Sequence, residues 1–297
     1  MKLLIKKVQK TGFSVANGAI FLIYMLICLY PLYYVYINAI SDPQMVARGE
    51  SVWYPKNIDF SIFLEMFTIP DIGKAITNSV LRTVLGTMLA IVTSSVAGYI
   101  FSKHVLKHRT FWYRYFILTG YISAGLIPGF LNAMELGVLN SFFWIYLAGA
   151  FNPPNLVITK TYMESLPLEL EEAAYIDGAS YVKRFLYVII PLCKPILAVT
   201  SVYVAVAQWN SYMDTMIYMT QGKYKTLQYI LYVYMNKANT LAEAIKNGAE
   251  VTAAMAKLTP MALRHAITAV TLTPIILVYP FLQKYFAKGI MMGAIKG

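Results

Sequence analysis

Charge is the scarcest property of this 297-residue chain. Only 13% of its residues are Asp, Glu, Lys or Arg, while 58% are hydrophobic and the mean hydropathy is +0.56. A soluble domain carries about 25% charged residues because they hydrate its surface. The low charge excludes a soluble enzyme, and the high hydrophobicity excludes a disordered chain. Most of the surface is therefore expected to face lipid.

Cysteine and histidine are also rare, with two and three copies. Cys28 and Cys193 lie far apart in apolar segments, so neither a disulfide framework nor a thiolate metal site is indicated. His104 and His108 are four residues apart, but no third ligand is nearby. A basic loop is the simpler interpretation, and no metal site is predicted.

Six apolar stretches are long enough to cross a bilayer, which takes roughly 20 residues of helix. Neither an internal repeat nor a second soluble domain is visible, so we expect one all-α transmembrane domain over residues 1–297. Pro153 and Pro154 interrupt the fourth stretch and should kink or break it. The expected spans are about 17–40, 75–101, 111–134, 139–159, 195–220 and 264–285.

The excess of basic residues predicts the orientation. The formal charge is +11, which suggests nucleic-acid binding in a soluble protein but cytoplasmic basic loops in a membrane protein. Lys and Arg gather in the terminal segments and in residues 103–114 and 160–194. Fewer basic residues lie in the two long loops expected on the other side of the membrane, 41–74 and 221–263. Both termini are therefore expected in the cytoplasm, with the protein in a cell membrane.

One predicted cytoplasmic segment, residues 165–191, is too patterned for a simple loop. Ser165 ahead of a proline suggests the start of a helix with an acidic first turn. Gly178 allows a sharp turn, because only glycine adopts positive φ without strain. Ser180 can cap a second short helix that ends before Pro191. The pattern predicts a helix–Gly–helix elbow outside the membrane.

The elbow has the features of a docking surface for a soluble partner. Ala173 and Ala174 present small side chains that let another surface approach closely. Glu172 and Asp177 flank them with negative charge.

The same residues carry a family resemblance. Permease subunits of binding-protein-dependent ABC importers share a cytoplasmic motif of Glu-Ala-Ala, three residues, Gly, nine residues, Ile, any residue, Leu and Pro. This chain resembles that motif with two aliphatic replacements. The resemblance implies a type I importer permease fold whose elbow docks on a separate ATPase. The matching positions are Glu172, Ala173, Ala174, Gly178, Val188, Ile190 and Pro191, with Asp177 beside them.

Further segments resemble the carbohydrate-uptake branch of this family: Asn78-Ser79, Trp209-Asn210 and residues 279–297. The carboxyl-terminal segment is most similar to permeases for oligosaccharides, including fragments of acidic polysaccharides. The resemblance implies a bacterial membrane location and alternating access. It also implies three kinds of partner protein: a second related permease, two ATPase copies and an extracytoplasmic solute-binding protein.

The chain itself is not expected to be an enzyme or to carry a cofactor. Residues 71–74 and 222–223 lack the preceding glycine and the following Ser or Thr at the spacing that a phosphate-binding loop requires. ATP and Mg²⁺ are therefore expected on the partner ATPase. The rival class is an ion-coupled secondary transporter or channel, which works without an ATPase. That class favours intramembrane carboxylates and internal repeats, whereas only Asp214 is available here.

Arg82 and Asp214 are the ionisable residues that stand out inside the expected spans. Such residues pair with one another or line a water-filled path. An interhelical ion pair that fixes packing is one interpretation. The other is that both side chains face the substrate pathway and help to admit sugars, including acidic ones.

The segment 208–212 adds candidate sugar contacts. Aromatic faces pack on the C–H surfaces of sugars, and planar amides bind their hydroxyls. Trp209, Asn210 and Tyr212 would suit a weak, transient sugar site. Helix–helix hydrogen bonding and an interfacial aromatic belt would use the same residue types, so both interpretations remain open.

Overall fold

The computed structural model describes the backbone of residues 2–51, 53–144, 149–246 and 260–294. Within these ranges the chain is mostly helical, and its β-pairing is limited to an isolated antiparallel bridge between Ser41 and Ile58. The all-α prediction is therefore confirmed for the described residues. The chain divides into two compact units, Met1–Pro70 with Val233–Leu272 and Asp71–Tyr232 with Thr273–Gly297.

The first unit begins with the long helix α1 (Lys2–Ala39), whose part Phe13–Ala39 is long and apolar enough to cross a membrane. Near the end of this helix, the buried Asn38 amide donates to the carbonyl oxygens of Tyr34 (2.8 Å) and Ser51 (3.0 Å). Two short helices follow, α2 (Pro43–Ala47) and α3 (Ser61–Thr68).

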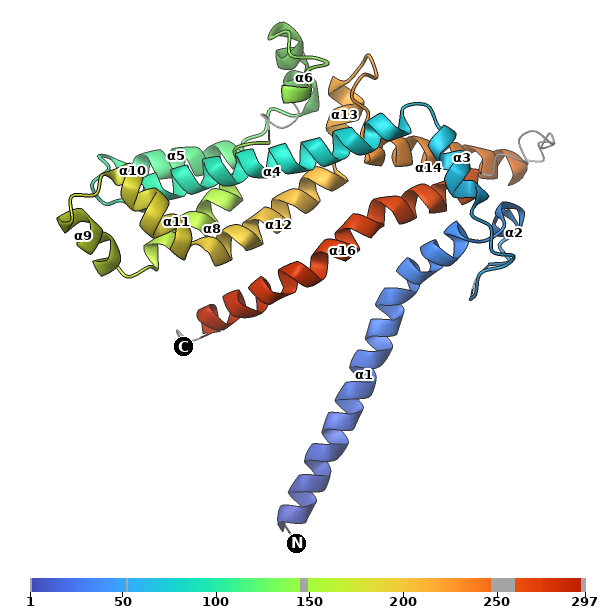
Figure 1. Cartoon of the computed structure of the whole chain (residues 1–297), viewed down its shortest axis with the longest axis horizontal. Coiled ribbons are helices and arrows are strands. Elements are labelled where there is room, and N and C mark those ends of the chain that lie inside the picture. Colours follow the sequence, from blue (N-terminus) through green and yellow to red (C-terminus); the bar gives the residue numbers. More distant parts are fainter. Residues whose placement is uncertain (1, 52, 145–148, 247–259, 295–297) are drawn as a thin grey trace. The chain divides into compact units, whose positions relative to one another are not determined.

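The second unit is built on α4 (Ile72–Ser102), which packs against α8 (Pro153–Glu164) and α12 (Lys194–Asn210) (Figure 1). Small residues at an interface between membrane helices let the two backbones approach closely. The buried positions on α4 include Ser79, Gly86, Ala90, Ser94, Ser95 and Gly98. This helix covers the second expected span and is itself long and apolar enough to cross a bilayer.

Two expected spans are interrupted. The third falls on α5 (Arg109–Tyr121) and α6 (Leu126–Glu135), which are bent by 106°. The fifth expected span falls on α12, which ends at Asn210, and on the separate short helix α13 (Met213–Tyr218). The spans at 111–134 and 195–220 remain predictions, but neither is one continuous helix, because hydropathy does not report backbone breaks.

The fourth expected span also differs, although residues 145–148 lie outside the described ranges. Helix α8 starts at Pro153 and continues to Glu164, beyond the predicted end of the span. The two prolines occupy its first positions, where the missing N–H would have no partner within the helix. The expected stretch is therefore broken ahead of Pro153, as predicted, and the prolines begin α8 without kinking it.

The carboxyl-terminal region contains α14 (Leu227–Lys246) and α16 (Pro260–Ala294). The sixth expected span lies within α16, whose apolar part is Ala262–Val278. In the described part of the chain, two helices have the length and composition to cross a membrane. The count rises to at most four if two bent pairs each form one span, α5 with α6 and Tyr181–Leu192 with Lys194–Asn210, the latter bent by 78°. Six spans therefore remain a prediction.

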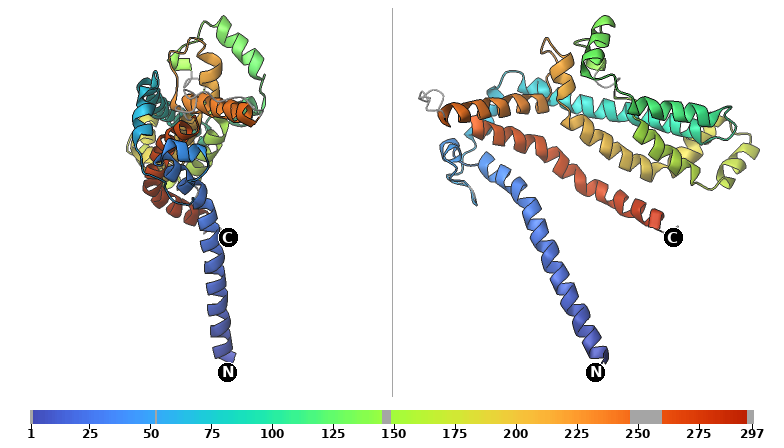
Figure 2. Two further views of the ribbon diagram at one scale, coloured as in Figure 1. Left: turned by 90° about the vertical axis from the view of Figure 1, so that its right-hand side faces the viewer. Right: turned by 180° about the vertical axis from the view of Figure 1, so that it is seen from behind.

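The elbow segment lies at the carboxyl end of α4, in both the front view and the view from behind (Figures 1 and 2). It consists of α9 (Glu169–Ile176), α10 (Tyr181–Arg184), a π-helical turn Phe185–Ile189 and α11 (Ile190–Leu192). Two details differ from the prediction. Ser165 ends α8 and does not start a helix, and the second part continues through the π-helical turn past Pro191.

Candidate functional site

The turn of the elbow depends on Gly178. Its φ is +77°, and a Cβ added there would meet no atom within 4 Å. The positive φ, and not a lack of space, is therefore what favours glycine. On the far side of the turn, the Ser180 hydroxyl accepts from the Lys183 N–H at 3.4 Å and caps α10.

The outer face of the elbow combines apolar and acidic side chains. Tyr175 is 66% exposed and Ile176 is 84% exposed. Of the motif residues, Glu172, Ala173, Asp177 and Gly178 are exposed, while Ala174 is half-buried. An exposed apolar patch flanked by charge is typical of a protein–protein contact.

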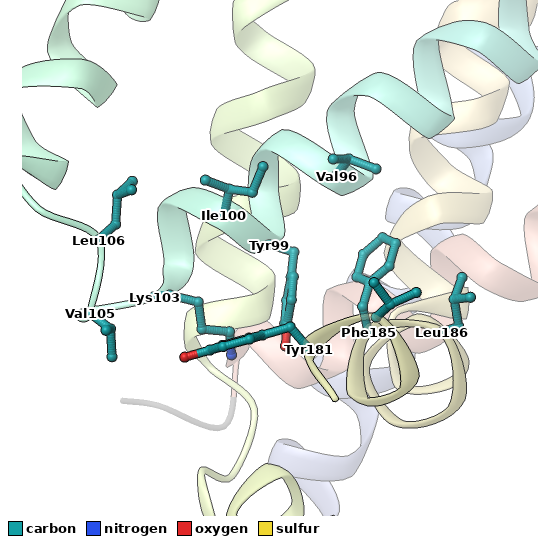
Figure 3. Close-up of a pocket in the computed structure, with 10 residues that line it drawn as sticks. Val96, Tyr99, Ile100, Lys103, Val105, Leu106, Tyr181, Phe185 and Leu186 are labelled. Atoms are coloured by element: carbon teal, nitrogen blue, oxygen red, sulfur yellow. The ribbon is translucent and has the colours of Figure 1, made fainter. Parts of the chain in front are cut away.

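The inner face is held by a residue that sequence reasoning did not single out. Glu171 is only 6% exposed and accepts a 2.8 Å hydrogen bond from the Tyr99 hydroxyl. Its carboxylate also pairs with Lys103 and, at 3.5 Å, with Arg184. Figure 3 shows Tyr99 and Lys103 of α4 facing Tyr181 and Phe185 of the elbow. Two sequence features could have indicated this contact. One is the acidic residue directly before the Glu-Ala-Ala motif, and the other is the basic residue Lys103 just after the second expected span.

The second candidate site is a cavity of about 420 Å³ within the second unit. Its lining combines an ion pair, planar amides and aromatic rings, which are the groups that bind sugar hydroxyls and sugar C–H surfaces. The charged and amide residues that line it are Arg82, Asp214, Gln208, Asn152 and Asn155, and the aromatic ones are Trp144, Tyr203 and Tyr218.

Arg82 and Asp214 form an ion pair and also line this cavity. The Arg82 side chain is 3% exposed and its two terminal nitrogens bind the two carboxylate oxygens of Asp214, one of them at 2.8 Å. Arg82 Nε donates to Gln208 Oε1 at 3.0 Å. The Asp214 carboxylate also accepts from the Ser211 hydroxyl at 3.0 Å. An interhelical ion pair and a position on a substrate pathway are therefore compatible interpretations, because the paired side chains also line the cavity.

Gly86 makes room for the amide that orients Arg82. It lies one helical turn after Arg82 on α4, and a Cβ at this position would come within 2.7 Å of Gln208 Cδ. Real Cβ atoms essentially never approach so closely. The absence of a side chain at Gly86 therefore allows Gln208 to reach the guanidinium.

The other predicted pathway residues do not line this cavity. Trp209 is buried, Asn210 accepts a 2.9 Å hydrogen bond from Gln228, and Tyr212 stacks on Tyr232 with ring centroids 4.7 Å apart. Neighbours in sequence point in different directions on a helix, since each residue advances by about 100°. The positions of α12 that reach the cavity are instead Tyr203, Val204, Ala207 and Gln208. These four positions share one face of the helix, and that spacing could have identified them from the sequence, whereas a run of consecutive residues could not.

The Asn78-Ser79 pair ties the start of α4 to the segment before α14. The Asn78 amide donates to the Lys225 carbonyl oxygen at 3.0 Å, and the Ser79 hydroxyl accepts from the Leu227 N–H at 2.8 Å. Asp71 reinforces the connection with a 3.3 Å ion pair to Lys225. The hydrogen bond and charge of Lys225 hold the pKa of the Asp71 carboxyl below its usual value.

The family follows from comparison with known proteins. The model described as "Binding-protein-dependent transport system inner membrane component" matches residues 110–292. The chain belongs to this family. The matched region includes both the elbow and the α12–α13 side of the cavity. Members of this family are transport components and not catalytic subunits, and the apolar helices fit their membrane location.

Relatives and a solved structure of this inner membrane component family are similar over most of their length. The polygalacturonan/rhamnogalacturonan transport system permease YtcP of Bacillus subtilis is 29% identical over 93% of this chain and 95% of its own. The maltodextrin permease MalD of Streptococcus pneumoniae is 26% identical over 81% of each. A chain of a bacterial ABC transporter that imports the acidic polysaccharide alginate aligns with a TM-score of 0.81 and 28% identity, covering 92% of this chain and 96% of that one.

Proposed function

We propose that this inner membrane component is a permease subunit of an ATP-driven importer of carbohydrate, in particular of oligosaccharides that include acidic ones. The observation that carries the proposal is the polar cavity around Arg82 within an otherwise apolar helical unit. The permeases it resembles serve polygalacturonan or rhamnogalacturonan, maltodextrin and alginate. Amides, aromatic rings and a guanidinium are chemically suited to such substrates.

Arg82 is the proposed receptor for a substrate carboxylate. A guanidinium binds a carboxylate with two parallel hydrogen bonds, and Asp214 already occupies the Arg82 fork in that way. A uronate carboxylate entering the cavity would compete with Asp214, which is 24% exposed and therefore easier to displace than the buried arginine. Trp209, Asn210 and Tyr212 remain proposed pathway residues for states in which the cavity is open to one side.

The substrate proposal can be tested in a reconstituted transporter. Arg82→Gln should reduce uptake of a uronate oligosaccharide more than uptake of a neutral one of equal length, because it removes the charge that selects the acid. Glu135→Gln is the control and should change neither, because Glu135 is exposed and does not line the cavity. Equal losses for both sugars, or a failure of Arg82→Gln to assemble, would assign Arg82 to packing alone.

The elbow is the proposed contact for the ATPase. The exposed residues Glu172, Ala173, Asp177 and Gly178, with half-buried Ala174, support this proposal. Exposed Tyr175 and Ile176 add apolar area to the same short segment. Closure of the ATPase on ATP binding would move the elbow and thereby switch the spans between their outward-open and inward-open arrangements.

Two substitutions test the docking assignment in purified complexes. Glu172→Ala should weaken the ATPase contact by removing one exposed charge, and Gly178→Pro should do so more strongly, because proline cannot adopt the positive φ. Glu135→Ala is the matched control for the loss of an exposed acid. Normal stimulated ATP turnover in both elbow variants would contradict the assignment.

The proposed assembly follows from the family's dependence on a binding protein. It consists of this permease, a second related permease, two ATPase copies that bind ATP and Mg²⁺, and an extracytoplasmic solute-binding protein. The chain would lie in a bacterial cell membrane with both termini in the cytoplasm. Of the six proposed crossings, α1 and α4 are long and apolar enough to cross as single helices, and the third lies on the bent pair α5 and α6.

A further inference from the structure

Helix α9 of the elbow is attached to the rest of its unit in an unusual way. Its one buried residue is Glu171, an acid. Its larger apolar side chains are exposed, with Leu170 at 45%, Tyr175 at 66% and Ile176 at 84%. A short helix normally docks through buried apolar side chains. In α9 the corresponding contact is electrostatic.

Glu171 is held by two residues of α4 and one of α10. Tyr99 Oη donates to one carboxylate oxygen at 2.8 Å, and Lys103 pairs with the other. Arg184 lies 3.5 Å away and is itself buried. The Lys103 amine also sits 4.3 Å from the centre of the Tyr99 ring, so that the two α4 residues support each other.

Tyr99 connects this charged cluster to an apolar core. Its ring belongs to a buried group with Met163, Ile189 and Cys193. The position of the Tyr99 hydroxyl is therefore fixed by packing from α8, the π-helical turn and the segment before α12. A hydrogen-bond donor held in this way defines where the Glu171 carboxylate can lie.

Apolar packing does not close the other side of the junction. A pocket of about 580 Å³ opens there between the end of α4 and the second half of the elbow (Figure 3). Val96 and Ile100 lie on one wall and Val182 and Leu186 on the other. The elbow residues that line this pocket belong to α10 and the π-helical turn and not to α9. In the described chain, the hydrogen bond and the ion pair that join α9 to α4 are those of Glu171.

The same helix carries the proposed substrate residue. Tyr99 follows Arg82 by 17 positions on α4, which is about 25 Å of helix at 1.5 Å per residue. No proline interrupts this stretch. A displacement applied at Tyr99 and Lys103 would therefore reach the cavity through a continuous helix.

We propose that Glu171 is a positioning residue that fixes the elbow to the end of α4, so that movement of the elbow is transmitted along α4 to the cavity around Arg82. The proposal rests on the proposed function, in which the elbow meets the ATPase. Glu171 does not itself contact that partner, since it is buried on the inner side of α9.

The test compares Glu171→Gln, Glu171→Asp and Glu169→Gln in the full transporter reconstituted in vesicles. Gln keeps the size of the side chain and an acceptor for Tyr99 but removes the charge that binds Lys103 and Arg184. Asp keeps the charge. Glu169 is exposed on the same helix, so its replacement is the control. The readout is the amount of sugar moved per ATP hydrolysed.

We expect Glu171→Gln to assemble with the ATPase and to hydrolyse ATP, while moving about 2- to 30-fold less sugar per ATP, the range for residues that couple two sites. Glu171→Asp should retain more of the coupling, and Glu169→Gln should match the wild type. The proposal is overturned if Glu171→Gln keeps the wild-type ratio. It is also overturned if Glu171→Gln loses its ATPase and Glu171→Asp behaves identically, since a general folding role would do both.

A distance measurement separates positioning from stability. Spin labels at Leu170→Cys and Val92→Cys, both exposed positions, report α9 relative to α4 in a Cys28→Ser background. Loss of the cluster should broaden the distance distribution in Glu171→Gln within assembled complexes. An unchanged distribution would refute the positioning role. If wild-type complexes do not bind the ATPase through the elbow, the proposed function fails instead, whatever Glu171 does.

Discussion

Replacing Gly86 with alanine should test the arrangement around Arg82 directly. The new Cβ would lie 2.7 Å from Gln208 Cδ and 2.8 Å from Nε2. Ordinary van der Waals contact begins at 3.4 Å, so the amide would have to retreat by about 0.7 Å. Its 3.0 Å hydrogen bond with Arg82 Nε would then be lost or badly stretched.

The expected free-energy change has two parts of opposite sign. A hydrogen bond to a charged group contributes about 1.5–3 kcal/mol, and its loss here leaves a donor of a buried arginine unpaired. Alanine in place of a helical glycine contributes about 0.5–1 kcal/mol in the stabilising direction. Gly86→Ala should therefore destabilise the chain by about 0.5–2.5 kcal/mol.

Gly18→Ala is the matched control, because Gly18 lies inside a helix with nothing within 4 Å of its added Cβ. Unfolding of the purified chain in mixed micelles, followed by circular dichroism, should place the two variants on opposite sides of the wild type. In a Gln208→Ala background Gly86→Ala should lose its penalty, since the clashing amide is gone. Equal stabilities for Gly86→Ala and Gly18→Ala would refute the role assigned to Gln208.

Three further outcomes are expected. Gly178→Ala should cost about 1–2 kcal/mol of strain at its φ of +77°, and limited proteolysis at the elbow should accelerate, whereas an unchanged rate would contradict the strain. Because the pKa of Asp71 is lowered chiefly by Lys225, its ion pair stabilises the fold above the ordinary carboxyl pKa and is lost as pH falls through the lowered value. Asp71→Asn should therefore flatten the acid limb of a thermal-stability profile. Tyr212→Leu should cost about 0.5–1.5 kcal/mol beyond lost area by removing the stack on Tyr232, and a double-mutant cycle with Tyr232→Leu would show no coupling if the stack contributes nothing.

The sequence was most informative where backbone chemistry is local. Gly178 predicted a turn because glycine alone takes positive φ freely, and Ser180 predicted a cap. The two long apolar helices followed from hydropathy, which requires only composition and length. Hydropathy missed the breaks after Tyr121 and Asn210, because an apolar segment can bend without becoming polar.

The candidate site was harder to predict because it joins residues distant in sequence. The Arg82–Asp214 pair was among the expected arrangements because few ionisable residues are available inside the spans. The hydrogen bond between Gln208 and Arg82 was not expected, since the Gln208 amide reaches Arg82 only through the space left by Gly86. Glu171 belongs to the acidic first turn of α9, and its position in sequence indicates no more than a favourable charge at a helix start. Its burial depends on how α9 folds back onto α4, which no local pattern specifies.

The exposed elbow has a consequence for the life of the chain before it finds its partners. An unassembled copy carries Leu170, Tyr175 and Ile176 on a helix that its own fold does not cover. Such a surface is what chaperones hold and quality-control proteases sample. Newly made copies in excess of the ATPase should therefore be short-lived. The cell would then adjust the amount of this permease by degradation of orphans as well as by synthesis.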